Sequence, residues 1–165
     1  MESTLVASDI KINGLITSLA VEEFETHSSF DEMLPEEVIS LFCSVAPEFT
    51  DSELQYAFDS EESALYFTIA GLKASFSVFN TNQWVNWAQG TKTDSFVLRA
   101  SLPSSYALTP LEALELNRLH PSLKFYLTDG IVIVEEAYYL AHGVPVLNLL
   151  DRVYSFLNNV NNLPM

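Results

Sequence analysis

The stretch that decides the fold is residues 123–143, LKFYLTDGIVIVEEAYYLAHG, where two runs of alternating apolar and polar residues meet at Asp129-Gly130. An Asp-Gly pair between such runs predicts a β-hairpin, because a type I′ turn needs positive φ at both central residues. A two-residue turn also fixes the register. From the turn outward it pairs Thr128 with Ile131, Leu127 with Val132, Tyr126 with Ile133, Phe125 with Val134, Lys124 with Glu135 and Leu123 with Glu136.

This register sorts the hairpin side chains onto two faces, because successive residues of a strand point to opposite sides. The face expected to lie under helices is apolar: Leu123, Phe125, Leu127, Val132 and Val134. The other face mixes apolar and polar side chains: Lys124, Tyr126, Thr128, Ile131, Ile133 and Glu135. That mixture has too much apolar area for open solvent and too much polarity for a core, so we predict a protein contact through Tyr126, Ile131 and Ile133. Glu135 and Glu136 point to opposite faces and are not expected to chelate one ion.

Helices and further strands are predicted upstream of the hairpin. From Ser8 the spacing of Ile12, Leu15, Ile16 and Leu19 predicts a first amphipathic helix. The segment LPEEVISLFC, residues 34–43, predicts a second helix that starts at Pro35. Alternating residues then predict meander strands in four segments: 54–58, 64–70 (ALYFTIA), 73–80 (KASFSVFN) and 95–102 (SFVLRASL).

Two more helices flank the hairpin. Thr109, Pro110 and Glu112 form the signature of a capped helix start, with Thr109 as N-cap, and Pro121 ends that helix. After Gly143, apolar residues recur every three or four positions from 146 to 160 and predict a core-facing terminal helix. We therefore predict one α+β domain over residues 1–165, in which a single antiparallel sheet (meander plus C-terminal hairpin) packs against N-terminal, middle and C-terminal helices.

Charge and composition exclude several classes of partner. Seven Lys and Arg residues against 22 Asp and Glu give a net charge of −15, which repels nucleic acids and anionic lipid surfaces. Residues 1–62 hold 15 of these acids and one base, Lys11. The sequence shows no membrane-spanning run and no signal-peptide pattern, and Cys43 is a single cysteine, so a cytoplasmic location is expected.

No pattern predicts catalysis or a cofactor. His27, His120 and His142 lack metal-ligand partners at suitable spacing, and nucleotide-binding glycine motifs and the GxSxG motif are missing. Cys43 falls on an apolar helix face, where an inert buried thiol is the expected state. We therefore predict a protein that is not an enzyme.

Two alternatives stay open at this point. The acidic clusters VEEFE, FDEML, PEEV and DSEES could bind Ca²⁺, a hard cation with oxygen ligands, or could be solvated helix faces, since none has EF-hand spacing. Trp84 and Trp87, in NQWVNWAQG, could contact a partner or could cover the core.

Residues 111–157 resemble the YbjN-like family on Asn117, Asp129, Gly130, Gly143 and Val144: an Asn-containing helix, an acidic-Gly hairpin, a Gly-Val pair and a closing helix. The element order is also similar to the fold of type III secretion chaperones. The resemblance implies a small, acidic, dimeric and non-enzymatic protein that binds protein segments, as a chaperone or a regulatory adaptor. The predicted partners are thus another protein or a second copy of the chain, with an acidic Ca²⁺-binding protein as the alternative.

Overall fold

The computed structural model describes residues 28–87, 90–103, 105–106 and 108–163. The helix predicted from Ser8, with Ile12, Leu15, Ile16 and Leu19, lies outside these residues. The acidic cluster VEEFE lies outside them as well.

A six-stranded antiparallel sheet is the centre of the described structure. Its strands are β2 (Gln55–Asp59), β3 (Ala64–Thr68), β4 (Ser75–Asn80), β5 (Ser95–Ser101), β6 (Lys124–Thr128) and β7 (Ile131–Tyr139). Their order in space is β2-β3-β4-β5-β7-β6, so the meander β2–β5 continues into the hairpin through the pairing of β5 with β7. The predicted α+β class, with a meander plus a C-terminal hairpin, is confirmed.

The hairpin has the register that its turn predicts. Strands β6 and β7 pair Thr128 with Ile131 and, at the far end, Lys124 with Glu135. Asp129 and Gly130 both have positive φ, at 50° and 77°, as a type I′ turn requires. Phe125, Val132 and Val134 are buried, which confirms the apolar face.

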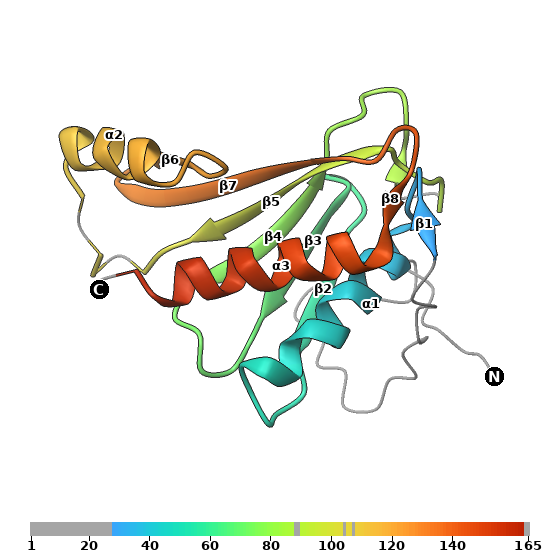
Figure 1. The fold of residues 1–165 in the computed structure, drawn as a ribbon, viewed down its shortest axis with the longest axis horizontal. Helices are drawn as coiled ribbons and strands as arrows, with labels where there is room; N and C mark the ends of the chain where they lie inside the picture. The colour runs from blue at the N-terminus through green and yellow to red at the C-terminus, as the bar shows by residue number, and fades with distance from the viewer. Residues whose placement is uncertain (1–27, 88–89, 104, 107, 164–165) are drawn as a thin grey trace.

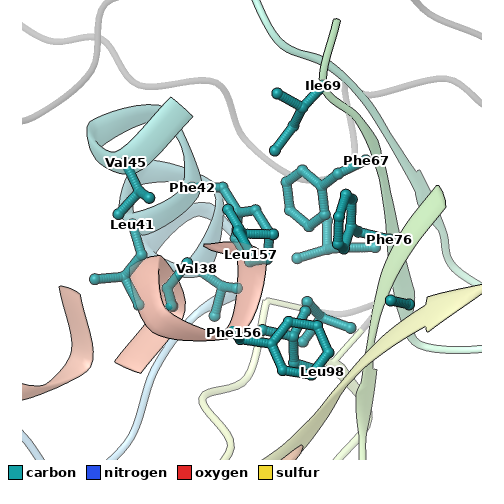
Figure 2. Close-up of a cluster of buried hydrophobic side chains, with 14 of the residues drawn as sticks. Val38, Leu41, Phe42, Val45, Phe67, Ile69, Phe76, Leu98, Phe156 and Leu157 are labelled. Atoms are coloured by element: carbon teal, nitrogen blue, oxygen red, sulfur yellow. The ribbon is translucent and has the colours of Figure 1, made fainter. Parts of the chain in front are cut away.

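Two helices cover this apolar face of the sheet. They are α1 (Pro35–Val45) and α3 (Val146–Asn161), which lie side by side in Figure 1. Figure 2 shows their side chains meeting those of the strands: Phe42 of α1 stacks on Phe67 with ring centroids 4.0 Å apart, and Phe156 of α3 meets Phe76 edge-on. The core is thus a layer of interlocked aromatic and aliphatic groups between helices and sheet.

The third helix, α2 (Pro110–Leu119), packs against the edge strand β6. Its start is the predicted capping box: Thr109 Oγ1 accepts from the Glu112 N–H at 3.1 Å, and Glu112 Oε1 accepts from the Thr109 N–H at 2.9 Å. Asn117 then pairs with the strand, because its Nδ2 donates to Phe125 O at 3.0 Å and its Oδ1 accepts from the Phe125 N–H at 2.7 Å. The side-chain amide satisfies backbone groups that an edge strand otherwise exposes.

Short elements complete the fold. The 3₁₀ turn η2 (Ala46–Glu48) follows α1, and β1 (Ser29–Phe30) pairs with β8 (Val144–Pro145) to form a separate two-stranded sheet. Sequence patterns do not predict the pairing of β1 with β8, since two-residue strands carry no periodicity. Within the described ranges, none of the helices has the length and apolar content needed to span a membrane.

Candidate protein-binding surface

The candidate site is the sheet face opposite α1 and α3, which we call the outer face. The strand registers arrange its side chains in three rows that cross the sheet. The row on the side of the β6–β7 turn contains Ser75, Ser101, Ile133 and Tyr126. The middle row contains Tyr66, Ser77, Arg99, Glu135 and Lys124. The row nearest the β4–β5 loop contains Ala64, Phe79, Val97 and Ala137.

A polar and aromatic network links the middle row to the two rows beside it. Arg99 forms an ion pair through Nε with Glu135 Oε2, and its guanidinium carbon lies 4.6 Å from the Phe79 ring centroid. Tyr126 OH donates to the same Glu135 oxygen at 2.6 Å, and Lys124 Nζ lies 5.3 Å from the Tyr126 ring centroid. These contacts fix Tyr126 in place before any partner binds.

The ion pair of Glu135 differs from the one that the hairpin alone suggests. Lys124 lies opposite Glu135 in the register, but the Glu135 carboxylate pairs with Arg99, which is its neighbour on β5. The hairpin sequence contains no information about β5, and the planar guanidinium suits a carboxylate better than an ammonium does. Lys124 is left with the Tyr126 ring as its described contact.

Two outer-face tyrosines are held as neutral hydrogen-bond donors. Burial and the bond to Glu135 raise the pKa of Tyr126 to about 12. Burial and a bond from Tyr66 OH to Glu62 Oε1 raise the pKa of Tyr66 to about 12. Each phenol therefore keeps its proton at neutral pH and presents a ring with a fixed orientation.

Three of the predicted contact residues lie together. Tyr126 and Ile133 are cross-strand neighbours and are half-buried, while Ile131, two residues closer to the turn on the same face, is 41% exposed. We call Tyr126, Ile131 and Ile133 the hairpin-end patch. Its position on the outer face agrees with the register derived from the sequence, and its use in binding stays a prediction.

The structure adds exposed leucines at the same end, which sequence reasoning missed. Leu111, Leu114 and Leu119 on α2 are 75%, 66% and 55% exposed. Because the opposite side of this helix uses Ala113 and Asn117 against β6, the leucines face away from the sheet. The sequence shows the leucines of the predicted helix, but only the docking of α2 on β6 decides which of them are covered.

The two tryptophans have different environments. Trp87 is fully buried, its indole N–H donates to Met33 O at 3.1 Å, and its ring stacks on Phe96. The prediction that Trp87 contacts a partner is therefore wrong, because Met33 and Phe96 enclose it in the core. Trp84 is 87% exposed and stays a candidate, although it lies in the β4–β5 loop at the opposite end of the sheet from Ile131.

A hydrogen-bonded frame holds the loop that carries Trp84. Asn80 Nδ2 donates to Asn82 O and Val85 O at 3.2 and 2.8 Å, and Thr93 Oγ1 lies 2.6 Å from Asn80 Oδ1. Asn82 Oδ1 in turn accepts a hydrogen bond from the backbone N–H of Trp84 at 3.0 Å. The backbone under Trp84 is thus anchored while the indole remains in solvent.

The remaining ionisable groups do not form a metal-binding cluster in the described residues. No group of three or more His, Cys, Asp or Glu side chains converges there. Burial and the nearby Glu53 raise the pKa of Cys43 to about 11, so its thiol is protonated at neutral pH and is a poor nucleophile. The Ca²⁺ prediction also involves acids outside the described residues and stays a prediction.

Glu136 points to the helix-covered face, as the register predicts. Its Oε2 lies 3.6 Å from Arg152 Nη2, and the Arg152 guanidinium carbon lies 4.1 Å from the Tyr138 ring centroid. Arg152 also donates to Ala137 O at 2.8 Å. Burial raises the pKa of Glu136, while Arg152 opposes this shift. The cluster ties α3 to β7.

Comparison of the chain with protein-family models, with curated proteins and with solved structures finds no match. The resemblance to the YbjN-like family and to the type III secretion chaperone fold stays a prediction.

Proposed function

We propose that the chain is a cytoplasmic, non-enzymatic protein-binding module that forms a homodimer through the hairpin-end patch. One observation carries the proposal: α1 and α3 pack on one face of the sheet, while the outer face carries partly exposed apolar side chains and no described helix. A single contact residue would mean little, but an apolar area with neighbouring exposed leucines is typical of a surface that a protein covers.

Local charge supports a second copy as the occupant of this patch. Two molecules of net charge −15 repel each other where their acids are concentrated, but the hairpin end is close to neutral. Three bases and four acids lie at this end, on the outer face of the hairpin and β5, in the β6–β7 turn and on α2. They are Arg99, Arg118 and Lys124 against Glu112, Glu115, Asp129 and Glu135. Self-association at this end therefore meets little electrostatic opposition.

The area that a stable dimer interface buries also favours a contact that includes α2. A stable interface buries roughly 800 Å² on each partner, which is more than three side chains supply. Leu111, Leu114 and Leu119 add apolar surface on the element that packs against β6, at the end of the molecule where Figure 1 shows the hairpin. The proposed contact thus extends from the outer face of the hairpin to the exposed side of α2.

Light scattering coupled to size-exclusion chromatography tests the proposal at micromolar concentration. The wild-type chain is expected to have twice the mass of the 18.5 kDa monomer. Ile131→Glu places a charge in the contact and is expected to weaken dimerisation at least tenfold. Leu147→Glu, at a similarly exposed position on α3, is the matched control and should stay dimeric. A wild-type monomer, or equal loss in both variants, would contradict the proposal.

A further inference from the structure

A second apolar surface lies at the other end of the outer face. Phe79, Val97 and Ala137 are half-buried neighbours on β4, β5 and β7. Tyr66 flanks this row at 36% exposure, and Tyr139, two residues beyond Ala137 on β7, is 72% exposed. We call these five residues the loop-end patch. No described helix covers it.

Trp84 lies at the same end. Thr81, at the start of its loop, donates from its N–H to Ser95 O, and Ser95 pairs with Tyr139. The Asn82 side chain bonds the Trp84 N–H through Oδ1 and donates through Nδ2 to Asp94 Oδ1, which ties the tryptophan to the start of β5. Because the backbone under this exposed indole is already anchored, binding through Trp84 orders its side chain but little backbone, which suits a binding anchor.

The charges around this end decide what the surface attracts. The β2–β3 turn adjoins the loop, since the Asn80 N–H donates to Ser63 O at 3.2 Å. Met33 pairs with Thr93 of the loop, so the two residues before Met33 lie at this end as well. These segments and the loop supply six acids and one base: Asp31, Glu32, Asp59, Glu61, Glu62 and Asp94 against Lys92. Arg99, whose guanidinium lies over the Phe79 ring, is a second base at the edge of the patch.

We propose that the loop-end patch and Trp84 bind an arginine-containing segment of another protein. The proposal names a partner class and rests on the proposed function of the chain in protein binding. Guanidinium groups stack on aromatic faces and pair with carboxylates. This end offers Trp84 and Tyr139 near Asp94 at the start of β5, and the acids of the β2–β3 turn lie on the far side of β4. The structure already contains such a contact, because Arg99 lies over Phe79 and pairs with Glu135.

The same charges disfavour a second copy of the chain, or residues 1–27 of the same chain, as the occupant of this end. A second copy carries −15, and residues 1–27 of the chain carry five acids and one base. Either one brings net negative charge to an acidic end. A cationic segment gains from the long-range field during approach and from aromatic stacking once bound.

Calorimetric titration with a (Gly-Arg)₅ peptide in 150 mM NaCl tests the proposal, with (Gly-Ser)₅ as the uncharged probe. We expect (Gly-Arg)₅ to bind and (Gly-Ser)₅ not to bind. Trp84→Ala is expected to weaken binding at least fivefold, and the double change Glu61→Gln with Glu62→Gln at least threefold. Because these side chains are exposed or in a surface turn, the variants should fold, which circular dichroism verifies.

Two matched variants separate a specific site from general attraction to an acidic protein. Tyr154→Ala removes an exposed aromatic ring from α3, and Glu112→Gln with Glu115→Gln removes two charges from α2. Both should bind the peptide as the wild type does. No binding of (Gly-Arg)₅ at millimolar concentration, or equal weakening by the distant charge variants, would overturn the inference.

The outcome is separable from the test of dimerisation. If the chain is a dimer but does not bind the peptide, the proposed loop-end site is wrong and the proposed homodimer stands. If the chain is a monomer and its peptide binding depends on Trp84, the proposed homodimer is wrong and the proposed loop-end site stands.

Discussion

At the scale of single residues, Asn117 shows how one side chain ends the sheet. Its amide matches both free backbone groups of Phe125 on the edge strand β6, with bonds of 3.0 and 2.7 Å. The same pair of bonds fixes α2 beside the hairpin and therefore sets the direction in which Leu111 and Leu114 point. An asparagine has the donor and the acceptor that this place needs, whereas aspartate lacks the donor.

Replacement of Asn117 is expected to destabilise the fold. Asn117→Ala removes two hydrogen bonds to a partly buried strand and should lower the free energy of unfolding by about 1–3 kcal/mol. Urea unfolding followed by circular dichroism measures the change. Asn161→Ala, at an exposed position on α3, is the control and should change stability by less than about 0.5 kcal/mol. Equal stability of Asn117→Ala and the wild type would contradict the assigned role.

At the scale of elements, hydrogen bonds anchor the described residues of the β4–β5 loop, 81–87 and 90–94. Thr93 is fully buried and its Oγ1 lies 2.6 Å from Asn80 Oδ1 and 3.0 Å from Ser95 O. Backbone bonds between Thr93 and Met33 add a second tie, to the segment before α1. The loop thereby buries Trp87 and exposes Trp84, three residues away.

Removal of the Thr93 hydroxyl is expected to loosen this loop. Thr93→Val keeps the side-chain shape but leaves Asn80 Oδ1 with one fewer donor, which should cost about 1–2 kcal/mol of stability. Acrylamide quenching of tryptophan fluorescence should rise as Trp87 becomes accessible. The exposed neighbour Thr91→Val is the control. Unchanged stability and quenching in Thr93→Val would show that the hydroxyl does not hold the loop.

Local signals in the sequence predict individual elements better than the contacts between them. Asp129-Gly130 predicts the hairpin and its register, and the Thr109–Glu112 pair predicts the start of α2, because both depend on residues a few positions apart. The pairing of β5 with β7 joins segments more than thirty residues apart, and it alone places Arg99 beside Glu135. The division of roles between Trp84 and Trp87 also depends on distant contacts, chiefly Met33 and Phe96.

At the scale of the whole molecule, the two faces of one sheet have different roles. The face toward α1 and α3 is closed by aromatic packing, as Figure 2 shows, and forms the core. The outer face has a nearly neutral hairpin end with exposed leucines beside it and an acidic loop end with an exposed tryptophan. This separation of charge is what the proposed self-association at one end and the proposed binding of a cationic partner at the other both require.

Hydrogen–deuterium exchange at two protein concentrations tests the central claim, that the hairpin end of the outer face is a protein-contact surface, most directly. Low concentration favours the monomer and high concentration the dimer. Added protection at high concentration is predicted in residues 110–119 and 124–135, with no change in residues 35–45 of α1 or 146–161 of α3. Protection that does not depend on concentration, or that rises in α1 or α3 while the hairpin stays unchanged, would contradict the account.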